Sequence, residues 1–311
     1  MPDPIIRTEH LSRSFGAVKA VDDLTLEVPA GIVFGFLGPN GAGKTTTIHL
    51  LLGLLEPSQG QASVLGFDTR NQSSAIHAHC GTLLEFAGLY ERMTAEDNLD
   101  LYGRINRMPA GDRRARIQEL LTHLDLWDRR KDIVGKWSKG MKQKLAVART
   151  LIHRPPLVFL DEPTAGFDPQ AAAALHKDLL SLVEREGVTV FLNTHNLVEA
   201  EKLCARVGVI RQGKLLTVGS PDELRRSNGA SQAEIVGSGF TDQMLAQLRA
   251  RQEVSRVELQ NGHLLIDLHE DSQVGPLVSL IVAAGGQVEE IRRGKASLED
   301  VFLTLMEEDK K

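Results

Sequence analysis

The sequence has few cysteines and contains no long apolar run. Its two cysteines, Cys80 and Cys204, lie far apart in 311 residues. They also lack the spacing of a metal site, which favours two ordinary apolar thiols in a reducing compartment. The longest apolar segment, 276–284, is less than half of the roughly 20 residues that a spanning helix needs. The N-terminus has no apolar stretch of signal-peptide length. We therefore expect a chain that is not exported and does not itself cross a membrane.

Basic charge is not in excess either. Charged residues make up 25% of the chain and the formal net charge is −5. No positive field therefore covers the whole surface, and nucleic acid is not an expected partner. The basic groups at 113–116 and 129–131 lie in amphipathic or turn-like sequence, and we interpret them as solvated faces. Because 311 residues is long for a single domain, we expect two.

One glycine-rich stretch organises the rest of the chain. It reads GPNGAGKTT from Gly38 to Thr46 and fits the pattern Gly-x-x-x-x-Gly-Lys-Thr. An apolar run precedes it and apolar residues at helical spacing follow it, so the predicted order is strand, tight loop, helix. In such a loop the backbone N–H groups turn toward phosphates and the helix adds its positive end. The candidate phosphate-binding residues are Gly38, Asn40, Gly41, Gly43, Lys44, Thr45 and Thr46. The motif alone leaves kinases, GTPases and many ATPases open.

A second strand ends in two acids. The apolar run Leu157–Leu160 is followed by Asp161 and Glu162, and the carboxyl ends of central strands are where parallel sheets hold ligands. Asp161 is suited to hold Mg²⁺ through water, beside the hydroxyl of Thr45. Glu162 is suited to polarise the attacking water as general base. Taken alone, the pair also fits a solvated turn.

Two further residues have two interpretations each. The apolar run Thr189–Thr194 delivers His195 at its end, where an imidazole can hydrogen-bond a γ-phosphate or the hydrolytic water. A structural histidine at a strand end is the alternative. Phe15 lies between strand-like runs and is either a ring that stacks on a nucleotide base or a core residue.

Helix signals separate these strands. Thr94 followed by Asp97 is a capping box, residues 112–124 are amphipathic, and Ser138 is a good N-cap for a helix that ends before Pro155. Helices inserted between the strands of a nucleotide-binding core predict a helical subdomain, at about residues 86–150.

At this point the motifs resemble those of a known family, the ATP-binding subunits of ABC transporters, over Ile5 to about Arg226. The segment WSKGMKQ, 137–143, is similar to the signature motif, which is the most discriminating of the set. GTPases and simple kinases have no counterpart of it, and the chain has no Asn-Lys-x-Asp segment. The other matching segments are Gly38–Thr46 (Walker A), Leu157–Glu162 (Walker B with the catalytic glutamate), Ala165–Asp168 (D-loop) and His195 (switch histidine).

The resemblance implies an α/β fold of the P-loop NTPase class, with a RecA-like core, a β-subdomain and an inserted helical subdomain. It also implies that two such domains dimerise head to tail around ATP and Mg²⁺. Ser138 and Gly140 would then face the γ-phosphate in trans, at a helix N-terminus, and Asp168 would contact the nucleotide site. Because the chain has one set of motifs, the expected partner is a second copy. The implied catalytic residues are Lys44, Glu162 and His195, and the implied metal ligands are Thr45, Glu85 and Asp161.

The chain departs from the family pattern at three positions. Glu85 stands where the family usually has a glutamine that contacts Mg²⁺. Its carboxylate could still ligate the metal but adds negative charge near the phosphates. Lys139 replaces the first glycine of the signature motif, and Phe167 replaces a leucine of the D-loop.

A finer resemblance is to the ATPases of drug, antibiotic and lipid exporters of the daunorubicin-resistance type. It is carried by Gly88–Leu99, by SKGMKQKL and by Ser297–Leu303. In that group the segment Leu89–Asn98 receives the coupling helix of a membrane subunit, although an ordinary exposed turn is the alternative for Tyr90. The resemblance implies a peripheral subunit at the cytoplasmic face of the membrane that hydrolyses ATP to export a hydrophobic substrate through separate membrane subunits. A soluble ABC ATPase that remodels a nucleoprotein complex and a low-turnover regulatory module are the alternatives.

The composition changes near residue 228, and we predict an ATPase domain at 1–226, a linker at 227–233 and a second domain at 234–311. The second domain is predicted to have the order βαββαβ, which is that of a small α+β ferredoxin-like sandwich. Asn261–Gly262 between alternating runs is a strong hairpin signal within it. Its predicted elements are a strand near Glu234, a helix at 242–251, strands at 255–260 and 263–268, a helix at 274–284 and a strand at 287–292. Ligand sensing, contact with the membrane subunit and dimer stabilisation are its candidate roles, and we favour the last.

Overall fold

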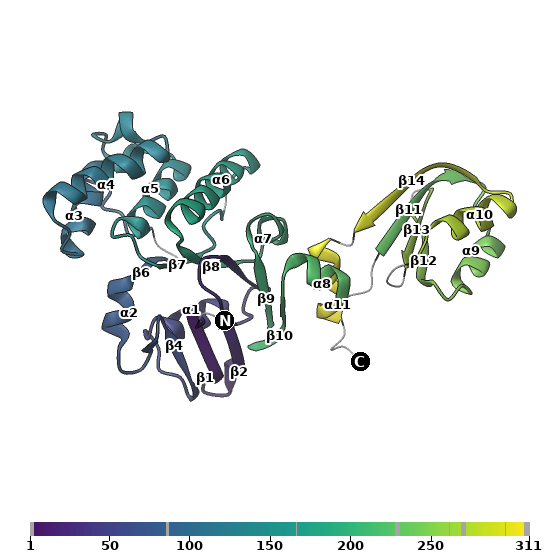
Figure 1. Ribbon diagram of the computed structural model, residues 1–311, viewed down its shortest axis with the longest axis horizontal. Coiled ribbons are helices and arrows are strands. Elements are labelled where there is room, and N and C mark those ends of the chain that lie inside the picture. Colours follow the sequence, from purple (N-terminus) through teal and green to yellow (C-terminus); the bar gives the residue numbers. More distant parts are fainter. Residues whose placement is uncertain are drawn as a thin grey trace. The chain divides into compact units, whose positions relative to one another are not determined.

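The computed structural model describes residues 3–84, 87–165, 167–227, 231–260, 262–268, 272–295 and 297–307. The chain divides into two compact units, residues 1–218 and 219–311 (Figure 1). The division lies earlier than the boundary predicted at residue 226. No helix in the described part of the chain is both long and apolar enough to span a bilayer.

The first unit combines two sheets with helices. Its strands are β1 (Ile6–Phe15), β2 (Val18–Val28), β3 (Val33–Leu37), β4 (Gln59–Val64), β5 (Phe67–Asp68), β6 (Cys80–Leu83), β7 (Leu157–Asp161), β8 (Thr189–Thr194), β9 (Arg206–Arg211) and β10 (Lys214–Gly219). Its helices are α1 (Lys44–Leu51), α2 (Ser73–His79), α3 (Ala95–Ile105), α4 (Ala110–His123), α5 (Lys139–Leu151), α6 (Pro169–Glu186) and α7 (Leu197–Leu203). Short 3₁₀ helices occupy Trp127–Arg129 and Val134–Lys136.

The larger sheet has the strand order β10-β9-β3-β8-β7-β6, and the neighbours from β9 to β6 run parallel. Strands β3 and β8 are buried along their whole length, as expected for parallel strands covered on both faces. The smaller sheet is antiparallel, in the order β2-β1-β4-β5. The predicted α/β class, with a separate β-subdomain, is confirmed.

The register of the parallel strands brings the candidate residues to one edge. Leu37, the last residue of β3, pairs with Thr194 at the end of β8. Asp161, at the end of β7, pairs with Asn193. The carboxyl ends of parallel strands are where ligands bind in such sheets, so the phosphate loop, the two acids and His195 all leave the sheet on the same side.

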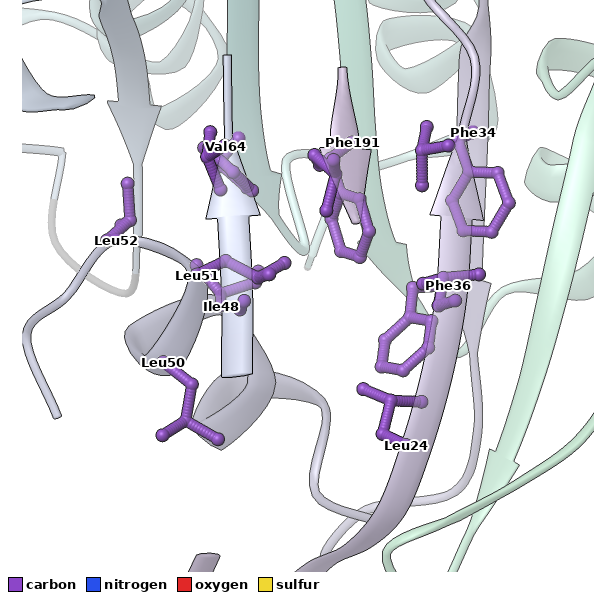
Figure 2. Close-up of a cluster of buried hydrophobic side chains, with 14 of the residues drawn as sticks. Leu24, Phe34, Phe36, Ile48, Leu50, Leu51, Leu52, Val64 and Phe191 are labelled. Atoms are coloured by element: carbon purple, nitrogen blue, oxygen red, sulfur yellow. The ribbon is translucent and has the colours of Figure 1, made fainter. Parts of the chain in front are cut away.

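Aromatic rings fill the centre of the core that lies under this edge. Phe191 of β8 is fully buried, and its ring centroid lies 5.6 Å from that of Phe34, 5.4 Å from Phe36 and 5.6 Å from Phe159. Figure 2 shows Phe191, Phe34 and Phe36 in the cluster of buried side chains that also contains Ile48, Leu50 and Leu51 of α1. The core therefore ties the strand that carries His195 to the strand and helix on either side of the phosphate loop.

Phe191→Ala is expected to lower the free energy of unfolding of the first unit by about 3–5 kcal/mol, because it removes buried ring contacts and leaves a cavity. Both tryptophans, Trp127 and Trp137, lie in that unit, so tryptophan fluorescence during urea unfolding reports on it alone. Leu54→Ala is the matched control, since Leu54 is 52% exposed and its loss should change the free energy by no more than about 0.5 kcal/mol. Equal effects of the two variants would contradict the central position of Phe191.

Helices α3, α4 and α5 contact one another and form a group in Figure 1. Thr94 accepts a hydrogen bond from the Asp97 N–H at the start of α3, and Ser138 accepts one from the Met141 N–H at the start of α5. Both predicted N-caps are thus confirmed. Arg116 of α4 is 2% exposed and donates to Glu186 at the end of α6 and to the carbonyl of Leu151. This buried ion pair fixes the helical group to the parallel core.

The elements of the second unit are α8 (Pro221–Ser227), β11 (Ser231–Ser238), α9 (Asp242–Arg249), β12 (Val254–Gln260), β13 (His263–Leu268), α10 (Gly275–Ala283), β14 (Gln287–Lys295) and α11 (Leu298–Glu307). Its strands form an antiparallel sheet with the order β12-β13-β11-β14. Apolar residues of the sheet and of α9 and α10 form its core. The order confirms the predicted ferredoxin-like arrangement, and Asn261 of the predicted hairpin lies outside the described residues. Helix α8, which we expected in the ATPase domain, contacts α11 of this unit. Strand β11 begins at Ser231, inside the segment predicted as linker.

Candidate active site

The phosphate loop joins β3 to α1, and its glycines are required by geometry. Gly43 is the N-cap of α1 with φ 105°, and a Cβ there would collide with the carbonyl oxygen of Ala20. Gly41 also has a positive φ, 79°, and has open space where a Cβ would lie. Only glycine adopts this conformation without strain, so the loop can keep its N–H groups close to a ligand.

Lys44 is the first residue of α1 and is 7% exposed. Its Nζ donates to the carbonyl oxygens of Gly38 at 2.8 Å and Pro39 at 3.2 Å. Burial lowers the pKa of Lys44, while the nearby carboxylates of Glu162 and Asp161 act in the opposite direction. The lysine is therefore a buried cation held by neutral carbonyls, a site suited to an anionic ligand.

Asp161 is held from both sides. The Thr45 hydroxyl donates to its Oδ2 at 3.0 Å, and Asn193 Nδ2 donates to its Oδ1. The carboxylate thus lies beside the hydroxyl at the start of α1. A hydroxyl, a carboxylate and the oxygens of a bound phosphate are ligands that Mg²⁺ prefers.

Glu162 and His195 face each other just beyond the ends of the adjacent strands β7 and β8. The Glu162 N–H donates to the carbonyl of Asn193 at 2.9 Å. Its Oε1 accepts from the His195 N–H at 3.1 Å and lies 2.7 Å from His195 Nδ1. Glu162 has a positive φ of 49°, a strained conformation of a kind that often occurs in active sites. The Glu162 carboxylate is therefore oriented by His195, the residue that the sequence predicts to act with it.

Most of these groups line a cavity of about 430 Å³, whereas the predicted site residues Gly38 and His195 are not part of its lining. Its lining residues that the sequence singled out are Asn40, Gly41, Gly43, Lys44, Thr45, Thr46, Asp161 and Glu162. The sequence reasoning missed others, namely Val18, Lys19, Ala20, Asn193 and Gln212. The sequence does contain an indication for Asn193, because this polar amide lies next to the end of the mainly apolar run that precedes His195.

Several predicted site residues lie outside the lining of this cavity. Phe15 is 46% exposed with the Arg13 guanidinium 4.7 Å from its ring centroid, so the core interpretation is wrong. It pairs with Val18, which does line the cavity. Asp168 is the N-cap of α6 and accepts from the Ala171 N–H at 2.9 Å.

The signature segment is likewise not part of the lining. Ser138 and Gly140 lie at the start of α5, and Lys139 between them donates from Nζ to the carbonyl of Ala165 at 2.6 Å. Glu85 lies outside the described residues, so its predicted metal contact has no structural account. Within the described ranges, no group of three or more His, Cys, Asp and Glu side chains forms a metal site.

Both units of the chain match known protein families. One family model, described as ABC transporter, matches residues 21–165. Another, described as the C-terminal domain of DrrA1-3-like ATP-binding proteins, matches residues 219–306. The second match begins at the division between the two units.

Relatives match along nearly the whole chain. The bacitracin transport ATP-binding protein BcrA of Bacillus licheniformis is 36% identical over 97% of this chain and 97% of its own length. The daunorubicin resistance ATP-binding protein DrrA3 of Streptomyces coeruleorubidus is 34% identical over 100% of this chain and 98% of its own. A solved structure of the ATP-binding subunit of an ABC transporter is 31% identical with a TM-score of 0.66, covering 72% of this chain and 93% of that one.

The fold and the site define a P-loop ATPase of the ATP-binding cassette class. The chain belongs to the ATP-binding subunits of ABC transporters, and its second unit is of the DrrA-like C-terminal type. Its reaction is the hydrolysis of ATP.

Proposed function

We propose that this subunit powers the export of a hydrophobic drug or antibiotic through separate membrane subunits, from the cytoplasmic face of the membrane. The observation that carries the proposal is similarity along both units to relatives named for bacitracin transport and daunorubicin resistance. A cassette that acted on nucleoprotein complexes would not require the DrrA-like unit that follows the ATPase here.

In the proposed reaction, the loop from Gly38 to Thr46 surrounds the phosphates and Lys44 neutralises their charge. Glu162 accepts the proton of the attacking water as general base. His195 holds the Glu162 carboxylate through its two contacts and is available to hydrogen-bond the γ-phosphate. Thr45 and Asp161 would hold Mg²⁺, which supplies charge neutralisation at the outer phosphates when bound.

The site is proposed to be completed by a second copy of the chain. Ser138 and Gly140 lie at the N-terminus of α5 but outside the cavity that Lys44 and Glu162 line. A head-to-tail dimer would bring this helix end of one copy to the phosphates bound by the other. Both sites would then be equivalent, as in any isologous pair.

Thr45→Ala is expected to raise the Mg²⁺ concentration that gives half-maximal ATPase activity by about tenfold or more, the range that loss of a supporting group costs a metal site. The physical reason is that the hydroxyl now held 3.0 Å from Asp161 would no longer ligate the metal. The measurement is an Mg²⁺ titration of ATPase activity at saturating ATP. Thr45→Ser keeps the hydroxyl and is the control; an equal shift in both variants would argue against ligation by Thr45.

The membrane partner is proposed to dock at Leu89–Asn98. This segment is ordered by Asn98, whose side chain accepts from the Tyr90 N–H at 2.8 Å and donates to the carbonyls of Tyr90 and Thr94. The Tyr90 side chain itself points into solvent, at 52% exposure. A rigid loop with an exposed aromatic ring is a suitable anchor for a partner.

The test of the proposed function is affinity purification of the tagged chain from detergent-solubilised cells of its own source, with mass spectrometry of the co-purified proteins. A multi-pass membrane protein in stable proportion is expected, and Tyr90→Ser should lower its yield. Ribosomal or DNA-bound partners in place of a membrane protein would overturn the transporter function.

A further inference from the structure

A buried carboxylate outside the nucleotide cavity connects the two segments that carry Glu162 and His195. Glu199 lies in α7, and its side chain has no exposure to solvent. It accepts three side-chain hydrogen bonds: from Thr164 Oγ1 at 2.9 Å, from Thr194 Oγ1 at 2.7 Å, and at 2.8 Å from Nε2 of His176 in α6. Both carboxylate oxygens are therefore engaged by fixed partners.

The two threonines flank the reacting pair. Thr164 follows Glu162 by two residues, and Thr194 immediately precedes His195. The Thr194 hydroxyl also accepts from the Asn196 N–H at 3.0 Å, so it fixes the turn on which His195 stands. Asn196 in turn accepts from the Glu199 N–H at 3.1 Å, which closes the link between this turn and α7.

The charge of the buried Glu199 carboxylate depends on its three hydrogen-bond donors. Burial alone would raise the pKa of its carboxyl, but the hydrogen bonds from His176, Thr194 and Thr164 outweigh burial and lower it. A buried anion is tolerated only where its donors stay in place. Any displacement of Thr164 or of the turn at His195 would leave the charge of Glu199 undercompensated, so the carboxylate resists such displacements.

We propose that Glu199 is a positioning residue for ATP hydrolysis, which clamps Thr164 and Thr194 so that the His195 imidazole keeps its contact with Glu162. His176 anchors the carboxylate to α6, so that the clamp is fixed to a long helix as well as to both loops. Glu199 makes no contact with the reacting atoms and acts through His195. The inference rests on the proposed roles of Glu162 and His195.

Glu199→Gln tests the clamp. The amide has nearly the same shape but places an NH₂ group where the carboxylate has an acceptor oxygen, so at least one of the three donors loses the oxygen to which it donates and the negative charge is lost. The expected result is a fall in kcat of about tenfold or more with the Kd for ATP within about twofold, because the residue does not line the nucleotide cavity. Glu184→Gln is the matched control. Glu184 is exposed on α6, in a groove of about 670 Å³ that His176 also lines, and its variant should keep kcat within about twofold.

A double-mutant cycle separates positioning from a general structural role. If Glu199 acts through His195, Glu199→Gln should cause no further loss of kcat in the His195→Ala background. Multiplicative losses would overturn the clamp while leaving the role of His195 intact. If His195→Ala alone keeps full kcat, the proposed role of His195 fails and the clamp fails with it.

Thr194→Val keeps the inference testable if Glu199→Gln fails to fold. The valine has the shape of threonine and leaves Glu199 with the donors from His176 and Thr164. A severalfold fall in kcat with unchanged Kd for ATP is expected, again absent in the His195→Ala background. Wild-type kcat in a folded Thr194→Val variant would overturn the clamp.

Discussion

Glu162→Gln is expected to lower the rate of ATP hydrolysis by about 10²-fold or more, the contribution of a positioned general base, while ATP still binds. The amide oxygen can accept from the His195 N–H, which now lies 3.1 Å from Glu162 Oε1, so the geometry of the loop should persist. What is lost is the group that takes the proton from water. The variant should therefore accumulate with ATP uncleaved between two copies.

The measurement is single-turnover phosphate release, combined with size-exclusion chromatography in ATP and Mg²⁺. Glu184→Gln serves as the control here too, because it makes the same chemical change at an exposed position. Hydrolysis at the wild-type rate in Glu162→Gln would show that another group is the base. A variant that stays monomeric with ATP bound would argue against the head-to-tail dimer and leave the role of Glu162 untouched.

The parts of the fold that could be predicted from sequence are those fixed by local patterns. The phosphate loop is a contiguous motif, and the caps at Thr94 and Ser138 are decided within three residues of each helix start. The strand ends at Asp161 and His195 follow from apolar runs that stop at a polar residue. Because neighbouring parallel strands end at the same edge of a sheet, pairing of these strands is enough to predict that Asp161 and His195 lie close together.

The rest depends on contacts between distant segments. Asn193 reaches Asp161 only because β7 and β8 pair in one particular register. The clamp likewise joins α6, α7 and two loops through Glu199, and no spacing in the sequence indicates it. The end of the ATPase domain was expected at residue 226, where the family resemblance ends and shortly before the composition changes, whereas α8 packs on α11 from the far end of the chain.

Lys44→Ala is expected to weaken ATP binding by about 10- to 150-fold, because a charge-assisted contact contributes roughly 1.5–3 kcal/mol. The buried ammonium is the cation nearest to the glycine loop, held toward it by the carbonyls of Gly38 and Pro39. Its removal takes the ammonium donor away from the Gly38 carbonyl, whereas the Pro39 carbonyl keeps its bond from the Ala42 N–H at 3.1 Å. It also leaves the carboxylates of Asp161 and Glu162 facing the phosphates with less compensation. Repulsion between these acids and ATP should therefore add to the loss of attraction.

The affinity would be measured by isothermal titration with ATP and Mg²⁺ in low and moderate salt. Lys19→Ala is the control, since Lys19 lines the same cavity but has a side chain that is 64% exposed and pairs with Asp22. Solvent screens such an exposed charge, so its loss should weaken binding by no more than about fivefold. Because a buried charge is screened less than an exposed one, the effect of Lys44→Ala should persist as salt rises, whereas that of Lys19→Ala should fade. Undiminished ATP affinity in Lys44→Ala would mean that the backbone N–H groups of the loop hold the phosphates without the lysine.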